Sequence, residues 1–180
     1  MVVKLPRTIR LDPSDTFVYE HAAEPGEWAV TGTFLFFGSD SATFSGKAQQ
    51  AFRGGFLGSG SFGWSTLVTV TEATDAERSA AIEQLAAQLV AHCGAPGMAA
   101  ARIAAEEEIA FAQSLCDHPP NTLLALHRVI EEAGIRETFR TLHRKESRLD
   151  PARAFRFVEV EEEERPMEEI DIRALAGRRE

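Results

Sequence analysis

Residues 122–143 read TLLALHRVI, EEAG and IRETFRTLH, and this stretch decides the fold. Two runs rich in strand-forming residues flank a short polar turn that contains glycine, which predicts a β-hairpin over 122–130 and 135–143. If Ile130 pairs with Ile135, alternate residues of the two strands share a face. One face then places Arg128 opposite Glu137 and is otherwise apolar, with Leu124, Leu126, Ile130, Ile135 and Phe139.

The other face of this hairpin carries His127, Arg136, Thr138 and Arg140. Three of these side chains are basic, although the whole chain has a formal net charge of -9. Such a patch attracts an anion, a carboxylate ligand or an acidic segment of a partner. His127, Arg136 and Arg140 are therefore the candidate ligand-binding or partner-binding residues. Two alternatives stay open: a plain solvent-facing sheet surface, or a patch covered by the chain's own acidic C-terminal segment.

Two longer helices are predicted before the hairpin. The first begins with a capping box formed by Thr74 and Glu77, and Gly94 is a natural stop. Its apolar stripe consists of Ile82, Leu85, Leu89 and Cys93. The second helix covers 97–116 and ends before two prolines. Its apolar side carries Ile109, Ala112 and Cys116.

The first part of the chain is predicted to form strands with one short helix between them. Two short strands within 7–20 surround the turn Asp12–Asp15, and an aromatic strand covers 28–37. A short helix over 46–53 ends at the glycine pair that follows it. A further strand over 62–70 alternates cleanly and places Trp64, Val68 and Val70 on one face.

This order of elements predicts an α+β fold. Strands and helices do not alternate regularly, so a doubly wound parallel sheet is not expected. We predict a mainly antiparallel sheet of about five or six strands with two longer helices packed on one face. Its core should contain Trp28, Phe34, Trp64, Val68, Leu85, Leu89, Ile109 and Phe139.

The composition changes near residue 147. Residues 1–146 have the composition of a globular α+β domain, whereas 147–180 is charge-dense and contains four consecutive glutamates, Glu161–Glu164. This second segment has too little apolar surface to fold alone, yet enough to anchor on a groove or a sheet edge. We predict a charged, acidic-rich C-terminal extension that contacts a protein partner or a second copy of the chain.

The stretch Gly58-Ser-Gly-Ser-Phe-Gly63 has the glycine spacing of phosphate-binding loops. In a dinucleotide-binding unit these glycines follow a strand and open a helix, whereas here they follow a predicted helix and open a strand. The protein-kinase version needs a lysine in the next strand and an Asp-Phe-Gly, and the chain has neither. We predict a loop that lets the neighbouring aromatic residues reach the core, and no binding of nucleotides.

Two other groups of residues have types found in active sites. Cys116, Asp117 and His118 adjoin a proline pair, but a zinc site needs about four ligands at matched spacing. Glu106–Glu108 lacks the Glu-x-x-His pairs of di-metal centres and is typical of a solvated helix face. Neither group predicts a metal site or a catalytic residue, and no cofactor is predicted.

Composition and charge exclude several classes of function. A net charge of -9 disfavours binding to nucleic acid and to anionic membrane surfaces. No run approaches the roughly 20 apolar residues that span a bilayer, and the N-terminus lacks the apolar core of a secretory signal. Only two cysteines are present, too few for a disulfide framework. A cytoplasmic location is expected.

Several segments together resemble a family of bacterial proteins catalogued only as a domain of unknown function. They are RTIRLDPSDTFVYE, AAEPGEWAV, AFRGGFLG, FGWSTLV, AAEEEIAFAQSLCDHPP and IRETFR. The resemblance covers 4–145 and leaves the extension outside it. It implies a compact bacterial cytoplasmic domain and supplies no activity, cofactor or catalytic residue.

The sequence favours a cytoplasmic accessory or protein-interaction protein without catalytic machinery, with the charged extension as its docking segment. The alternative is a domain that binds a small anionic ligand, or a minor enzyme, with a pocket near the glycine-rich loop. A pocket with convergent polar groups favours the alternative.

Overall fold

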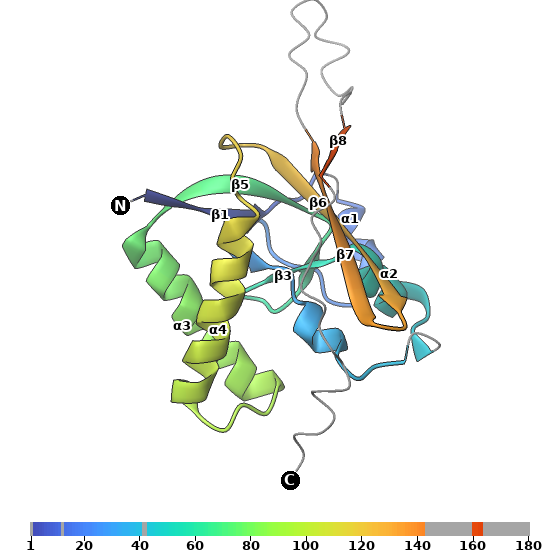
Figure 1. Cartoon of the computed structure of the whole chain (residues 1–180), viewed down its shortest axis with the longest axis horizontal. Helices are drawn as coiled ribbons and strands as arrows, with labels where there is room; N and C mark the ends of the chain where they lie inside the picture. Colours follow the sequence, from blue (N-terminus) through green and yellow to red (C-terminus); the bar gives the residue numbers. More distant parts are fainter. Residues whose placement is uncertain (1, 12, 41–42, 143–159, 164–180) are drawn as a thin grey trace, which may run out of the picture.

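The computed structural model describes residues 2–11, 13–40, 43–142 and 160–163. A five-stranded antiparallel sheet in the order β1-β5-β6-β7-β8 forms the main layer (Figure 1). Its strands are β1 (Val2–Thr8), β5 (Leu67–Thr74), β6 (Leu123–Glu131), β7 (Gly134–Leu142) and β8 (Val160–Glu163). A smaller antiparallel sheet contains β2 (Ala29–Val30), β3 (Phe56–Gly58) and β4 (Trp64–Ser65).

The predicted hairpin is confirmed, including its register. Ile130 pairs with Ile135 and Arg128 with Glu137, across a turn at Glu132 and Ala133. The two strands alternate between buried and exposed residues, because one face covers the core and the other meets solvent.

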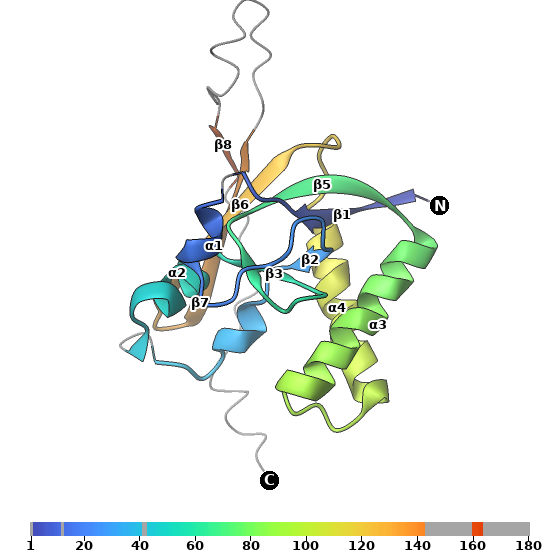
Figure 2. The ribbon, with the colours of Figure 1, turned by 180° about the vertical axis from the view of Figure 1, so that it is seen from behind.

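Two long helices, α3 (Asp75–His92) and α4 (Met98–Ser114), lie side by side against β1, β5 and β2 (Figures 1 and 2). The predicted capping box is present, since Glu77 N donates to Thr74 Oγ1 at 3.2 Å and Thr74 N donates to the Glu77 carboxylate at 2.8 Å. The short helix α2 (Gly46–Gly54) ends where predicted and packs on β6. The fold is α+β, as the sequence predicted.

Two predicted strands near the N-terminus are wrong. Instead of a strand after the Asp12–Asp15 turn, the chain forms the single helical turn α1 (Asp15–Val18), stabilised by the bond from Thr16 Oγ1 to Pro13 O at 2.7 Å. The predicted strand over 28–37 is reduced to β2, and a 3₁₀ helix, η1 (Thr33–Phe36), follows it.

Gly32 explains why β2 stops early. It has a φ of 74°, a left-handed conformation that ends a strand and favours glycine. A Cβ there would lie 2.7 Å from Leu57 Cβ, so the site is also too crowded for a side chain. The predicted strand over 62–70 is likewise divided, because β4 belongs to the small sheet and β5 to the large one.

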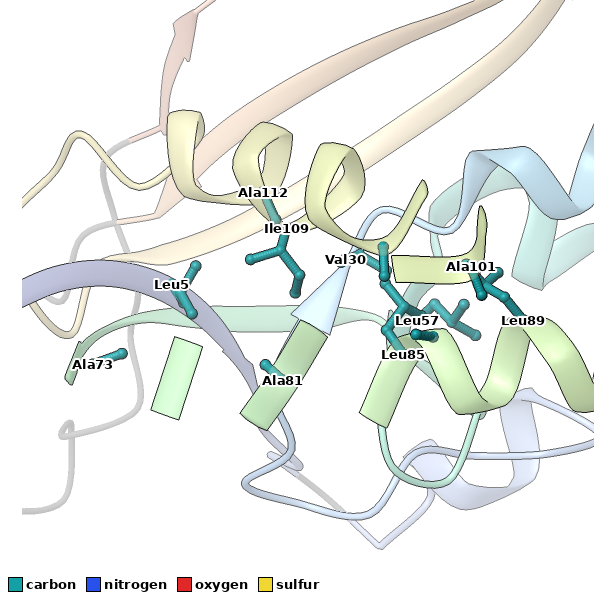
Figure 3. Close-up of a cluster of buried hydrophobic side chains, with 12 residues drawn as sticks. Leu5, Val30, Leu57, Ala73, Ala81, Leu85, Leu89, Ala101, Ile109 and Ala112 are labelled. Carbon is teal, nitrogen blue, oxygen red and sulfur yellow. The ribbon is translucent and has the colours of Figure 1, made fainter. Parts of the chain in front are cut away.

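The core consists of three clusters, the largest of which lies between α3, α4, β1 and the small sheet (Figure 3). Of the predicted core residues, Val68, Leu85, Leu89, Ile109 and Phe139 are buried. Trp28, Phe34 and Trp64 are half-buried and pack against the clusters. Cys93, predicted on the apolar stripe of α3, is exposed. Alanines fill the contact between α3 and α4, where Ala81, Ala86, Ala101 and Ala105 are buried.

Candidate functional site

The candidate binding residues His127, Arg136 and Arg140 share the exposed face of the β6–β7 hairpin, as predicted. All three are exposed. His127 pairs directly with Thr138, and the two arginines flank Thr138 along β7. Residues at such diagonal positions lie roughly 7–8 Å apart, so the three side chains can contact one extended ligand.

Each arginine of this basic face has an acidic neighbour. Arg136 Nη2 lies 3.0 Å from Glu131 Oε1 in an exposed ion pair at the end of the hairpin. The register places Glu162 of β8 opposite Arg140. The run of glutamates in the extension therefore joins the sheet beside the basic face, as a fifth strand at its edge.

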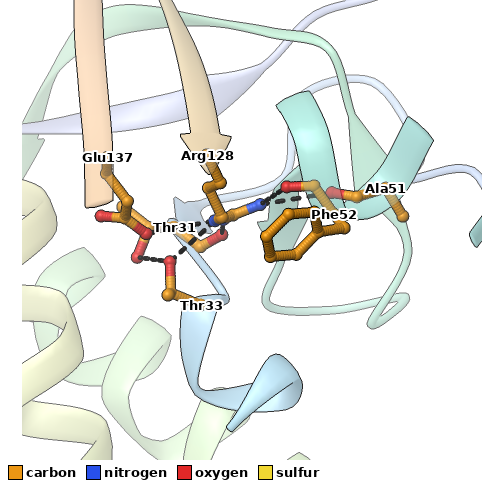
Figure 4. A network of polar contacts seen from close by, with 6 residues as sticks. All are labelled: Thr31, Thr33, Ala51, Phe52, Arg128 and Glu137. Carbon is orange, nitrogen blue, oxygen red and sulfur yellow. Dashed lines mark hydrogen bonds and ion pairs between the residues drawn. The ribbon is translucent and has the colours of Figure 1, made fainter. Parts of the chain in front are cut away.

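The buried face of the same hairpin carries an ion pair between Arg128 and Glu137 (Figure 4). Arg128 Nε lies 3.1 Å from Glu137 Oε1, and both side chains are almost fully buried, with exposed fractions of 0% and 2%. Burial lowers the pKa of Arg128 and raises that of Glu137, while their mutual attraction opposes both shifts.

Arg128 also ties the hairpin to two other segments. Its Nε donates to Thr33 Oγ1 at 2.9 Å, and its Nη2 donates to the carbonyl of Thr31. Its Nη1 donates to the carbonyls of Ala51 and Phe52 at 3.2 and 3.0 Å, at the C-terminal end of α2. These bonds engage the guanidinium on all three nitrogens, so the arrangement acts as an internal clamp.

The sequence placed Arg128 opposite Glu137 on an otherwise apolar face but did not indicate what the arginine holds. Its partners in η1 and α2 come from distant segments, and most of them are backbone carbonyls. Glu137 Oε2 is buried and has no hydrogen-bond partner among the described residues. A charged pair within an apolar strand face was the only available signal.

The glycine-rich loop between β3 and β4 encloses a carboxylate of its own chain. Ser61 donates to Glu27 through both its backbone N and its Oγ, the latter at 2.7 Å, and Glu24 N donates to Glu27 Oε2 at 2.7 Å. A Cβ on Gly58 or Gly60 would lie 2.6 or 2.7 Å from a Glu27 oxygen. A side chain at either glycine would therefore displace the Glu27 carboxylate from its present position.

We predict that this loop does not bind ATP, GTP or NAD. The backbone N and the Oγ of Ser61 already donate to Glu27, and the loop leads into the strand β4 and not into a helix. Isothermal titration calorimetry should show no heat of binding at micromolar to millimolar nucleotide. Micromolar affinity that is abolished by Gly60→Val would contradict this prediction.

A small pocket lies near this loop, between the α1 region and β4. Its lining includes Arg10, Tyr19, Trp64 and Thr66, and it has room for little more than one water molecule. The Tyr19 and Thr66 hydroxyl oxygens are 2.8 Å apart and bond to each other. The pocket is far smaller than typical small-molecule sites.

The two other groups with residue types found in active sites, Cys116–His118 and Glu106–Glu108, do not form a metal site. Cys116 is buried, and His118 accepts a hydrogen bond from Lys4 Nζ through its backbone carbonyl at 2.7 Å. Glu106 and Glu107 are exposed on α4. Within the described ranges, no group of three or more acidic, histidine or cysteine side chains could hold a metal ion.

The two cysteines should differ strongly in reactivity. Burial raises the pKa of Cys116 to about 12, and its side chain is inaccessible, whereas Cys93 is exposed. The thiolate is the reactive form, so an aromatic disulfide reagent at pH 8 should label Cys93 quickly and Cys116 only after unfolding. In Cys93→Ser the fast phase should disappear, and a fast phase in that variant would show that Cys116 is accessible.

Among the described residues, no helix is both long and apolar enough to cross a membrane.

Comparison with known proteins identifies a family but no individual relative. No curated protein and no solved structure matches the chain. The model of DUF6505, a family of unknown function, matches residues 2–162, beyond the predicted 4–145 and into β8. The match covers most of the chain, which therefore belongs to this family of unknown function, as the resemblance predicted.

Proposed function

We propose that this chain is a cytoplasmic accessory protein of bacteria that acts by binding another protein, with residues 147–180 as its docking segment. The observation that carries the proposal is the exposed basic face of the β6–β7 hairpin, beside which the acidic part of the extension joins the sheet. Two charged residues with functional groups common in active sites have structural partners instead: Arg128 joins three segments, and Glu27 fills the glycine-rich loop.

Charge and apolar anchors contribute differently to such docking. Exposed ion pairs stabilise a complex by at most about 1 kcal/mol each and weaken with salt. The apolar residues of the extension, among them Phe155, Phe157 and Ile170, must then supply most of the affinity. These residues lie outside the described part of the chain, so their contacts stay a prediction.

A truncated chain, 1–146, tests the proposal. It should stay folded, because β7 is the one described strand that pairs with β8, and its partner binding or self-association should be weakened. Analytical ultracentrifugation and affinity capture from the native cell would compare it with the full chain. A second truncation, 1–166, keeps β8 and removes Ile170, so it separates the contribution of 147–166 from that of 167–180.

Two results would count against the proposal. If 1–146 is unfolded by circular dichroism, the extension is part of the core and the boundary at 146 is wrong. If it is folded and keeps every partner and its oligomeric state, the extension is not the docking segment.

A further inference from the structure

Among the described residues, only part of the outer edge of β7 is paired with another strand. β8 pairs with β7 over Phe139–Leu142. Over Gly134–Thr138, no strand among the described residues pairs with this edge. The backbone groups along such an edge can pair with an added strand.

The β7 edge is also held rigidly from behind. Ile135, Glu137 and Phe139 point into the protein and are buried, and Arg128 fixes Glu137. A strand template held in this way does not need to reorganise when another strand pairs with it.

The opposite edge of the sheet is less suited to pairing. β1 contains Pro6, which cannot donate a backbone hydrogen bond. Its end is already covered, because Thr8 N donates to Glu27 O and Gly26 N donates to Thr8 O, both at 2.8 Å. In the part of the chain that the structure describes, β7 is therefore the edge better suited to an added strand.

We propose that the β7 edge is a docking site for an extended acidic segment of a partner protein, which adds to the sheet as a strand. The charge of the site favours this partner, since Arg136 and Arg140 are exposed on β7 and His127 is exposed on the neighbouring β6, in a chain with a net charge of -9. This inference goes beyond the proposed function, because it adds a second contact with a partner, made by β7 of the folded domain and not by the extension.

β8 acts as a built-in occupant of this site. It brings Glu161–Glu163 to β7 and places Glu162 opposite Arg140, so an acidic strand already lies where the partner would lie. The connection from β7 to β8 runs through residues 143–159, far more than the two residues that join a tight hairpin. A strand of four residues on so long a connection can leave the edge and be replaced.

The length of the connection also decides against a second copy as the main occupant. Because residues 143–159 link β8 covalently to β7, β8 competes for this edge at an effective concentration on the order of millimolar, which exceeds ordinary concentrations of another copy. An outside segment must therefore bind more tightly than β8, or bind after β8 is released.

The experiment uses the full chain and a labelled peptide of residues 158–165, VEVEEEER, as the probe. In the double variant Glu161→Pro/Glu162→Pro, two consecutive backbone N–H groups are lost. Since consecutive N–H groups of a strand face opposite sides, at least one bond to β7 breaks. By fluorescence anisotropy, the peptide should bind this variant at least about tenfold more tightly than the wild type, because its internal competitor is gone.

Three further measurements define the site. Arg140→Glu in the double variant should abolish binding, whereas Arg102→Glu, the same charge change on the surface of α4, should leave it unchanged. The affinity should fall as salt is raised. Hydrogen exchange of the backbone amides of 134–142 should slow when the peptide binds, which separates strand addition from attraction of charges alone.

The outcomes that overturn the proposal are distinct. Equal binding to wild type and double variant, binding unaffected by Arg140→Glu, or no binding at millimolar peptide would each refute it. A double variant that dimerises without peptide would assign the edge to a second copy instead. If the proline variant is unfolded, Glu161→Lys/Glu162→Lys replaces it, since that change weakens β8 through charge alone. The assay needs no native partner, so its failure does not affect the truncation test.

Discussion

Arg128→Met is expected to lower the free energy of unfolding by about 3–5 kcal/mol, because it leaves the buried Glu137 carboxylate without its counter-charge. The same change removes hydrogen-bond donors from the carbonyls of Thr31, Ala51 and Phe52. Buried acceptors without partners add to the loss. Urea unfolding followed by circular dichroism at pH 7 measures the effect.

Two variants serve as controls for this result. Arg136→Met removes an exposed ion pair from the same hairpin and should cost at most about 1 kcal/mol. Arg128→Met/Glu137→Leu removes both charges and should recover part of the loss, since no unpaired charge remains. A cost for Arg128→Met no larger than that for Arg136→Met would show that the clamp does not stabilise the fold.

The pKa direction of Glu137 adds a dependence on pH. Burial raises its folded pKa above the unfolded value, so the folded state binds the proton more tightly than the unfolded state. The contribution of this group to stability is present in full below the unfolded pKa and is lost as pH rises through the folded pKa. Above that pH Glu137 is ionised, and its buried negative charge is then stabilised by the neighbouring positive charge of Arg128.

The hairpin and its basic face were predictable because both depend on local patterns. Alternation with a period of two, together with a short turn, specifies which residues share a face, and a shift by one residue would bury Arg136 and Arg140. The capping box of α3 and the end of α2 were predictable for the same reason, since each depends on residues within one or two turns.

The contacts that give the charged residues their roles were not predictable. Ser61 donates a hydrogen bond to Glu27, and Arg128 donates one to the carbonyl of Thr31. In each pair the two residues are far apart in the sequence, so no local pattern connects them. β8 could not be predicted either, because its glutamates lack the apolar alternation of a strand. β2 ends earlier than predicted because Gly32 adopts a left-handed conformation. The aromatic residues around it predict a continuous strand and give no sign of this break.

Trp64→Ala should lower the free energy of unfolding by about 3 kcal/mol, the low end for loss of a large aromatic residue, because the side chain is only partly buried. Trp64 packs against two of the three core clusters and stacks on Phe36 with 5.3 Å between ring centroids. Its ring fills the space beside Gly32 and Gly55, where an added Cβ would lie 3.0 and 2.8 Å from it. Chemical denaturation measures the loss.

The cost of Trp64→Ala should depend on Arg128, because the guanidinium carbon lies 6.0 Å from the Trp64 ring and 5.3 Å from Phe36. Trp64→Phe keeps an aromatic ring at this place and should cost less than Trp64→Ala. In a double-mutant cycle, Trp64→Ala with Arg128→Met should cost less than the sum of the single changes, since each disrupts the same junction of clusters. Additivity within about 0.5 kcal/mol would show instead that the aromatic cluster and the clamp stabilise the fold independently.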